Sequence, residues 1–392
     1  MTPAARVQTA IGLLDQVIAA ALAKGPPADR VLADWFRASR FAGSKDRRAI
    51  RELVYQAIRH CGPVPQTGRA AMLALAEEDP ALLLLFDGSP YGPAPIEEGE
   101  LIAEAGIAPE WLVERLAASD IAGPEAAALL DRAPLDVRVN ALKAERVSLE
   151  LPMAGEALPS AQGLRFPFGT AVEQWDAYRD GLIEVQDGGS QLACEAVAAK
   201  PGETVIDLCA GAGGKTLSLA AAMANGGTLI AADTDRGRLG KLAPRAGRAG
   251  ALIAETVLLD PGREAEALAA WHGKADAVLV DAPCSGSGTW RRNPEARWRL
   301  DAAALERLTA LQRHLLEVAA QLVRPGGRLV YVVCSMLDEE GAGQAAVFLA
   351  DHPEFRADPP ALPLGRPRGP GIRLTPFHDG TDGFFIASLE KA

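Results

Sequence analysis

The stretch VIDLCAGAGGKT, residues 205–216, decides the fold. It begins with an apolar run, which is typical of a strand buried on both faces of a parallel sheet. Three glycines follow at Gly211, Gly213 and Gly214. Glycines at a strand-to-helix turn let a ligand approach backbone amides that have no partner within the helix. The stretch therefore predicts the first strand, the ligand loop and the first crossover helix of an α/β domain.

Similar apolar runs recur further along the chain. Helix-length segments separate them, which indicates parallel strands joined by helical crossovers. We therefore predict a doubly wound, Rossmann-like α/β domain over residues 187–392. Its strands are expected at residues 204–208, 228–232, 253–259, 277–280 and 329–333, with a last strand at 384–389.

The N-terminal third has a different periodicity. Apolar residues recur at helical spacing over residues 5–22 and again over 50–61, which predicts an all-helical domain over residues 1–130. Residues 131–186 begin with strand-like alternation and continue with proline-rich connections. We predict a small α+β linking module there.

Composition excludes several classes of protein. The 392 residues are 48% apolar and 23% charged, as in a globular enzyme. No run of 18 uninterrupted apolar residues is present, so we expect no membrane span and no membrane partner. The five cysteines are widely spaced without a C-x-x-C motif, so we expect neither disulfides nor a bound metal. These features predict a cytoplasmic protein with reduced thiols.

The net charge of −11 is unevenly distributed along the chain. Residues 1–69 carry 11 basic and 5 acidic side chains, whereas residues 70–130 carry 1 and 12. Because so much of the acid lies in one stretch, other parts of the chain can present basic surfaces to nucleic acid.

The glycine loop fits one of three nucleotide-binding classes. A P-loop requires glycine where the chain has Cys209, and a dinucleotide fingerprint requires glycine where it has Thr216. An adenosyl site requires neither. Asp233 ends the next strand, 22 residues after Gly211, where a carboxylate can accept both ribose hydroxyls. The structural alternatives are a plain tight turn and, for Asp233, a helix N-cap.

Two cysteines end two successive strands. Cys284 follows Asp281 after one strand, and Cys334 follows the next. Ligands bind outside the carboxyl ends of strands in open α/β sheets, so we expect both thiols beside the glycine loop. A thiolate that adds to C6 of cytosine activates C5 toward a sulfonium methyl group, and an acid such as Asp281 near N3 stabilises the adduct. Spacing does not say which cysteine attacks.

Six motifs make a resemblance specific. Over residues 130–392 the chain resembles the bacterial RNA 5-methylcytosine methyltransferases of the Sun/NOL1/NOP2 family. The segment SKDRRAIRELVYQAIRH at 44–60 resembles the NusB-like N-terminal domain of the ribosomal small-subunit branch, the RsmB type. The six motifs, in family order, are VQDGGSQLA (185–193), DLCAGAGGKT (207–216), AADTDRGRL (231–239), DAPCSGSG (281–288), GGRLVYVVCS (326–335) and DGFFIASLE (382–390).

The resemblance implies roles for individual residues. It implies Cys334 as the nucleophile, Cys284 as the group that assists product release, S-adenosyl-L-methionine as the cofactor, and RNA, above all 16S rRNA, as the substrate. The implied cofactor contacts are Cys209, Ala210, Gly211, Ala212, Gly213, Gly214, Lys215, Asp233, Asp260 and Asp281.

The chain departs from the family pattern at two places. Ala212 stands where the family usually has proline, and LDEEG (337–341) stands where it usually has Pro-Glu-Glu-Asn. We expect a slight shift of the nucleophile loop and retained activity.

The segment WRRNPEARWR, residues 290–299, predicts contact with RNA. Arginine pairs with phosphate or stacks on bases, and tryptophan stacks on an unpaired base. The alternative is a solvated loop whose tryptophans pack inward. The predicted RNA-binding residues are Trp290, Arg291, Arg292, Arg297 and Arg299.

The helical domain offers a second RNA surface at Arg47, Arg48 and Arg51. The target cytosine must be unpaired or flipped out before C6 can be attacked. We expect the enzyme to act as a monomer.

Three other functions remain open. Methylation of another RNA, such as tRNA, uses the same chemistry. A cytosine-5 DNA methyltransferase uses the Pro-Cys motif, here Cys284, as its nucleophile and carries a large recognition domain that this chain lacks. A catalytically inactive RNA-binding protein with this fold would leave both cysteines and the three aspartates without a role.

Overall fold

The computed structural model describes all 392 residues and divides the chain into two compact units. Unit 1 comprises Met1–Asp131 and Thr289–Ala302, and unit 2 comprises Arg132–Gly288 and Ala303–Ala392. Two features differ from the sequence-based division. The module at 131–186 lies in the same unit as the Rossmann-like domain, and the segment 289–302 leaves that domain for the helical unit.

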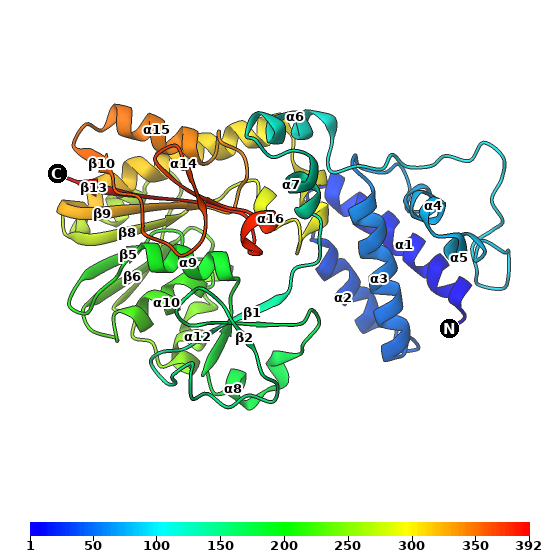
Figure 1. Cartoon of the computed structure of the whole chain (residues 1–392), viewed down its shortest axis with the longest axis horizontal. Coiled ribbons are helices and arrows are strands. Elements are labelled where there is room, and N and C mark those ends of the chain that lie inside the picture. Colours follow the sequence, from blue (N-terminus) through cyan, green and yellow to red (C-terminus); the bar gives the residue numbers. More distant parts are fainter. The chain divides into compact units, whose positions relative to one another are not determined.

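Unit 1 is built from helices (Figure 1). Helix α1 begins where the Thr2 side chain accepts the N–H of Ala5, and α4 begins in the same way at Thr67. Helices α1, α3 and α4 pack together and bury aliphatic side chains such as Leu14 and Val54. The helices are α1 (Pro3–Leu22), α2 (Ala28–Ala38), α3 (Ser44–His60), α4 (Gly68–Glu78), α5 (Pro80–Leu83), α6 (Glu110–Ala118) and α7 (Gly123–Ala128), with the 3-10 helix η4 (Pro294–Arg299).

Helix α1 is long and apolar enough to cross a membrane, judged by length and composition alone. However, 44% of its apolar window is buried inside the protein. A core helix of a soluble protein passes the same test, so α1 is weak evidence for a membrane span.

Unit 2 begins with a small antiparallel sheet in the order β2-β3-β1-β4. Val137, Val139 and Phe166 fill its apolar face together with Ile183. The elements of this part are β1 (Leu135–Val139), β2 (Glu156–Ala157), β3 (Gly163–Phe166), η1 (Val172–Gln174), α8 (Asp176–Arg179) and β4 (Ile183–Val185).

The rest of unit 2 is a nine-stranded mixed sheet in the order β11-β12-β13-β9-β8-β5-β6-β7, with β10 paired to β13. Strands β7, β6, β5, β8 and β9 are parallel, and β13 runs antiparallel to β9. The six predicted strands are present; β10, β11 and β12 were not predicted. The strands are β5 (Thr204–Asp207), β6 (Thr228–Asp233), β7 (Glu255–Leu258), β8 (Ala275–Asp281), β9 (Val323–Val333), β10 (Phe355–Ala357), β11 (Arg366–Arg368), β12 (Gly371–Leu374) and β13 (Phe384–Lys391).

Helices cover both faces of this sheet (Figure 1). Successive residues of a strand point to opposite faces, so Ile206 joins the core under α14 and α15, whereas Val205 joins the core under α9, α10 and α12. This is the doubly wound Rossmann-like fold. The helices are α9 (Gly188–Ala196), α10 (Gly214–Ala222), α11 (Arg236–Leu239), α12 (Leu242–Ala249), α13 (Glu264–Ala267), α14 (Ala302–Leu322), α15 (Ala342–Asp351) and α16 (Pro376–Asp379), with the 3-10 helices η2 (Ala269–Trp271) and η3 (Ser287–Thr289).

The strand order reverses at β5, because β6 and β7 lie on one side of it and β8 and β9 on the other. In open α/β sheets a ligand crevice forms at this switch point, outside the carboxyl ends of the strands. The glycine loop follows β5, and Asp233, Asp281 and Cys334 end or follow β6, β8 and β9.

Candidate active site

The glycine loop connects β5 to α10 in a conformation that requires glycine. The φ angles of Gly211 and Gly213 are +55° and +86°. A Cβ atom on Gly213 would lie 2.2 Å from Cδ1 of Leu242, so this position has no room for a side chain. Ala212 has no positive φ, and its carbonyl accepts a 2.7 Å hydrogen bond from Nη1 of Arg245. The loop therefore keeps a fixed conformation although alanine stands where the family usually has proline, because the hydrogen bond from Arg245 holds the backbone at this position.

Asp233 holds the glycine loop to the end of β6. Its Oδ2 accepts the N–H of Gly211 at 2.7 Å, and its Oδ1 accepts the N–H of Asp235 at 2.7 Å. The helix N-cap role belongs to Asp235, whose side chain accepts the N–H groups of Gly237 and Arg238. Each Asp233 oxygen keeps a second lone pair for a further donor.

Lys215 and Asp281 form an ion pair at the carboxyl end of β8. Nζ of Lys215 donates to Oδ2 of Asp281 at 2.6 Å and lies 5.7 Å from the ring centroid of Phe384. Burial lowers the pKa of Lys215, but the charge and hydrogen bond of Asp281, together with Cys194 and Cys334, outweigh this, so the pKa of Lys215 is raised. Cys334 also contributes to this shift, which places a positive charge within electrostatic reach of that thiol.

A second carboxyl group, Asp207, ends β5 and is fully buried. Its Oδ2 accepts the hydroxyl of Thr216 at 2.7 Å, while Oδ1 has no hydrogen-bond partner in the protein. Burial raises the pKa of Asp207 to about 7. The sequence analysis missed this group, although a carboxylate as the last residue of a buried strand is an unusual signal.

The structure brings Cys284 and Cys334 together. Their sulfur atoms lie 3.4 Å apart, and both residues are partly exposed. The hydrogen bond with Cys334, together with burial, raises the pKa of Cys284 well above that of an ordinary thiol. The two thiols form one site because parallel strands β8 and β9 are neighbours, so their carboxyl ends meet.

Glu340 is a further buried carboxylate that the sequence analysis missed. It lies in the LDEEG segment and accepts hydrogen bonds from the serine after each cysteine, Ser285 and Ser335. The role of Glu340 could not be predicted from local sequence, because its partner Ser285 lies in another loop, 55 positions earlier in the chain.

The remaining predicted aspartate is Asp260, which follows β7 and is exposed. Its backbone carbonyl accepts the N–H of Arg263. Because β6, β7 and β8 all run in the same direction, Asp233, Asp260 and Asp281 lie at the same edge of the sheet.

These residues fit S-adenosyl-L-methionine, a cation with ribose hydroxyls and an amine. Asp233 has free acceptor capacity for the hydroxyls, and Asp207 carries a buried oxygen without a partner. A Cβ atom built on Gly214 would meet nothing within 4 Å, so the loop is open on that side. Carboxylates at three strand ends suit a positively charged ligand.

The segment 290–299 does not present its predicted RNA-binding side chains to solvent. Trp290 and Arg297 are fully buried, and Arg291 is 5% exposed. Arg292 and Arg299 are half-buried. The prediction that Trp290, Arg291 and Arg297 bind RNA is therefore wrong for this structure, because these side chains are buried.

Arg297 instead caps the C-terminus of α3. Its Nη2 donates to the carbonyl of Ile58 at 2.5 Å and to that of Cys61 at 2.7 Å, and its Nη1 donates to Pro294. The last carbonyls of a helix lack intrahelical partners and carry the negative end of its dipole, so a cation satisfies both needs. Burial lowers the pKa of Arg297.

The neighbouring side chains of the segment make similar contacts. Oε1 of Glu295 accepts the N–H of Ala28, the first residue of α2, at 2.9 Å. The Arg299 guanidinium donates to the carbonyls of Gly25 and Pro26, each at 2.8 Å. The arginine-rich segment is therefore a structural part of the helical unit.

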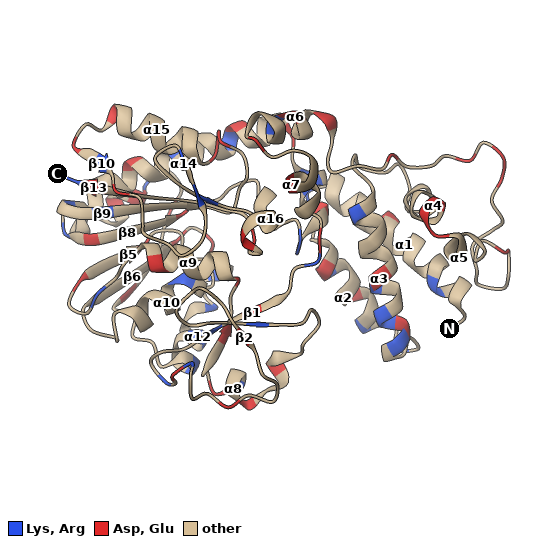
Figure 2. Cartoon of the chain, viewed as in Figure 1, with Lys and Arg blue, Asp and Glu red and all other residues tan.

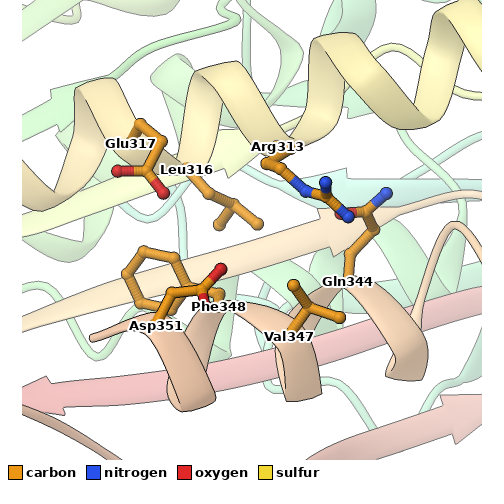
Figure 3. Close-up of a pocket in the computed structure, with 7 residues that line it drawn as sticks. All are labelled: Arg313, Leu316, Glu317, Gln344, Val347, Phe348 and Asp351. Carbon is orange, nitrogen blue, oxygen red and sulfur yellow. The ribbon is translucent and has the colours of Figure 1, made fainter. Parts of the chain in front are cut away.

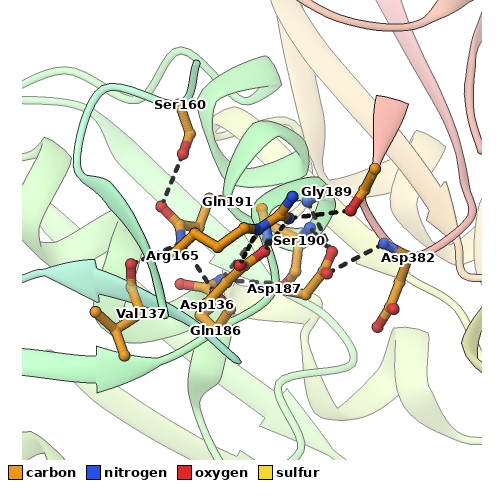
Figure 4. A network of polar contacts seen from close by, with 12 residues as sticks. Asp136, Val137, Ser160, Arg165, Gln186, Asp187, Gly189, Ser190, Gln191 and Asp382 are labelled. Carbon is orange, nitrogen blue, oxygen red and sulfur yellow. Dashed lines mark hydrogen bonds and ion pairs between the residues drawn. The ribbon is translucent and has the colours of Figure 1, made fainter. Parts of the chain in front are cut away.

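The VQDGGSQLA motif joins the small sheet to the Rossmann-like domain (Figure 4). Arg165 donates to both oxygens of Asp136, at 2.7 and 2.8 Å, and Asp136 also accepts the N–H of Gly188. Asp187 caps α9 and accepts the N–H of Asp382 at 3.1 Å. The motif therefore has a structural role in this protein, since its Asp187 and Gly188 contact both the small sheet and the segment before β13.

A shallow groove lies elsewhere, between α14 and α15 (Figure 3). Apolar side chains such as Leu316 and Phe348 line it together with the charged side chains of Arg313, Glu317 and Asp351. None of the residues of the candidate site lines this groove.

Comparisons with known proteins show which family the chain belongs to. Residues 194–390 match the family described as 16S rRNA methyltransferase RsmB/F. The chain is 37% identical over 275 residues to a probable ribosomal RNA small subunit methyltransferase B from Synechocystis, covering 66% of this chain and 60% of that protein. It is 33% identical over 313 residues to the ribosomal RNA small subunit methyltransferase B of Sodalis glossinidius, covering 76% and 69%.

A solved methyltransferase homolog protein from Pyrococcus horikoshii is also similar. It is 27% identical, with a TM-score of 0.58, and the match covers 72% of this chain and 99% of that one. The chain thus spans less than two thirds of the Synechocystis relative but nearly all of this archaeal structure. Because the family model matches about half of its length, the chain belongs to the 16S rRNA methyltransferase RsmB/F family.

Proposed function

We propose that the protein methylates carbon 5 of a cytosine in 16S rRNA, with S-adenosyl-L-methionine as the methyl donor. The observation that carries this proposal is the pair of thiols 3.4 Å apart, next to the Lys215–Asp281 ion pair, at the switch point of the sheet. Two adjacent thiols serve a reaction in which one sulfur must bond to the base and later leave it.

The glycine loop, Asp233, Asp260 and Asp281 hold the cofactor in this proposal. When bound, S-adenosyl-L-methionine supplies an electrophilic methyl group. Asp233 accepts hydrogen bonds from the ribose, and the backbone amides of the glycine loop face the ligand. Lys215 keeps the Asp281 carboxylate oriented through its 2.6 Å hydrogen bond.

Cys334 adds to C6 of the cytosine, and this makes C5 nucleophilic. Lys215, whose pKa is raised, carries a positive charge within electrostatic reach of this sulfur. After methylation the C5 proton must leave and the bond between C6 and sulfur must break. Cys284, held as a thiol beside Cys334, assists this release.

The names of the relatives point to ribosomal RNA of the small subunit as the substrate. A transfer RNA target or an inactive RNA-binding protein would share the fold. Bisulfite sequencing of 16S rRNA from a strain that lacks the gene tests the proposal, because 5-methylcytosine resists conversion to uracil. One cytosine that resists conversion in the parent strain should be converted in the deletion strain. If 16S rRNA is unchanged and a methylated cytosine is instead lost from tRNA, then tRNA is the substrate.

RNA binding by the helical unit is supported by one basic surface. Arg40, Lys45, Arg48 and Arg51 are exposed around the end of α2 and the start of α3, where basic side chains gather (Figure 2). Phe41, between them in sequence, is 72% exposed and offers a ring for stacking. Arg47 is partly buried and donates to the carbonyl of Ala42, so it holds the loop between α2 and α3 in place and is less available to RNA.

Charge reversal tests this surface. The double variant Arg48→Glu and Arg51→Glu should weaken binding of a 16S rRNA fragment and reduce its salt dependence, because two phosphate contacts are lost. Equal affinity would remove the helical unit from the RNA interface.

We further propose that the protein works in the cytoplasm as a monomer without a membrane partner. All five cysteines are unpaired, including two whose sulfur atoms are within 3.4 Å, which supports a reducing compartment. Light scattering of the purified protein with and without RNA tests the monomeric state.

A further inference from the structure

The side chain of Glu340 is buried between the loops that carry the two cysteines. Its Oε1 accepts the N–H of Ser285 at 2.8 Å and the side-chain amide of Gln312 at 3.1 Å. Its Oε2 accepts the hydroxyls of Ser285 and Ser335, the latter at 2.5 Å. Ser285 directly follows Cys284, and Ser335 directly follows Cys334.

Further contacts fix this carboxylate in place. The Tyr331 hydroxyl donates to the backbone carbonyl of Glu340 at 2.5 Å. The side-chain amide of Gln312 also donates to the carbonyl of Pro283, at 2.9 Å, so α14 holds the residue before Cys284 as well. The Ser287 hydroxyl lies 3.1 Å from that of Ser335 and accepts the N–H of Met336 at 2.8 Å.

The Glu340 carboxylate therefore accepts four hydrogen bonds. A buried carboxylate requires such donors, and four of them fill its lone pairs. Two of the donors come from the loop after β8 and one from the loop after β9, so the carboxylate binds the two loops to each other.

We propose that Glu340 is a positioning residue that sets the spacing between the thiols of Cys284 and Cys334. The inference rests on the proposed function for its consequence in catalysis, but the spacing itself is a property of the folded protein. Glu340 does not touch the substrate; it acts through the serines next to each cysteine.

The spacing matters because one cytosine must meet both thiols during a single turnover. Misplacement of a reacting group by about 1 Å can reduce the rate about a hundredfold. The charge of Glu340 also contributes, after the hydrogen bond from Cys334 and burial, to the raised pKa of Cys284. The same residue thus influences both the position and the protonation of that thiol.

The test measures the spacing without RNA or cofactor. Diamide first adds to one thiolate, and the second thiol then displaces the reduced hydrazine to form the disulfide; the rate of this second, cross-linking step, followed from the adduct, reports how often the two sulfurs meet. The Cys284–Cys334 cross-linked peptide is followed by mass spectrometry in the full-length protein. The variant is Glu340→Gln, which keeps the shape but turns an amide donor toward the serine hydroxyls.

The matched control is Glu339→Gln, the same change at the neighbouring, partly exposed residue. We expect Glu340→Gln to slow cross-linking about tenfold and to reduce the kcat of methylation about a hundredfold, with KM for RNA unchanged. The control variant should have the same cross-linking rate and the same kcat as the unmodified protein. Cross-linking at the full rate in Glu340→Gln would overturn the proposal.

A second variant covers the case in which Glu340→Gln does not fold. Replacing both Ser285 and Ser335 by alanine removes the hydroxyl donors and keeps the carboxylate charge, and it should slow cross-linking in the same direction. A folded double variant that cross-links at the full rate would also overturn the proposal. If cross-linking slows but the unmodified protein methylates no cytosine, the proposed function fails and the positioning role stands.

Discussion

The sulfur atoms of Cys284 and Cys334 lie 3.4 Å apart, although the two residues are 50 positions apart in the chain. Each follows the carboxyl end of a parallel strand, and the two strands are direct neighbours. Lys215, from the helix that follows β5, is within electrostatic reach of Cys334 and pairs with Asp281 at the end of β8, so groups that follow three neighbouring strands meet at one edge of the sheet.

The two thiols should fail in different ways when each is replaced. Cys334→Ala removes the sulfur that bonds to C6, and methylation should fall to background. Cys284→Ala leaves that bond possible but impairs release, so a covalent RNA–protein adduct should accumulate. Denaturing gel electrophoresis detects the adduct, and ribonuclease should remove it.

The double variant of these cysteines is the control and should form no adduct. An adduct with Cys334→Ala and none with Cys284→Ala would exchange the two roles. If both single variants remain active, the thiols are structural.

Asp233→Asn should weaken cofactor binding without unfolding the protein. The amide oxygen keeps one of the two backbone hydrogen bonds, the amide NH2 group gives up the other, and the charge toward the ribose is lost, which costs about 1.5–3 kcal/mol for each charge-assisted hydrogen bond. This is roughly a ten- to hundredfold loss of affinity, measurable by titration calorimetry. Asp235→Asn is the control, because asparagine caps α11 as well as aspartate does. Unchanged affinity in Asp233→Asn would remove Asp233 from the site.

Asp207 should make the protein less stable as the pH rises from about 4 to about 7. In the unfolded chain this carboxyl loses its proton near pH 4, whereas burial raises its pKa to about 7 in the folded state. The folded state therefore binds more protons in this range, and the loss amounts to about 4 kcal/mol when complete above pH 7.

Asp207→Asn should abolish this part of the pH dependence, since the amide stays neutral and can still accept the Thr216 hydroxyl. Urea unfolding at pH 5 and pH 8 measures the difference. The variant should be the more stable protein at pH 8, and a parallel pH dependence of the two proteins would show that Asp207 is ionised in the folded state.

Arg297→Met should destabilise the helical unit by about 3 kcal/mol. The substitution leaves the buried carbonyls of Ile58 and Cys61 without their donor, and such groups are costly when unpaired. Thermal unfolding followed by circular dichroism measures the loss. Arg30→Ala removes an exposed ion pair with Asp34 and should cost less than about 1 kcal/mol. Equal effects of the two substitutions would contradict the capping role of Arg297.

Much of the candidate site could be predicted from local patterns. The apolar run before the glycine loop determines β5, and the next runs determine β6, β8 and β9, because each is a short segment that is hydrophobic on both faces. Parallel strands then bring Asp233, Asp281 and the two cysteines to one edge of the sheet. Those placements required no knowledge of distant contacts beyond the rule that parallel strands end together.

Only the tertiary structure decided the roles of Glu340 and of the segment 290–299. Arginine and tryptophan suit both an RNA surface and a buried cap, and their local sequence is the same in either case. The choice depends on partners more than 230 positions away, since Arg297 meets the free carbonyls of Ile58 and Cys61. Glu340 likewise acquires its role from Ser285, 55 positions before it. Sequence patterning determines which face of an element is buried, whereas the hydrogen-bond partner of a buried polar group is known only when the chain has folded.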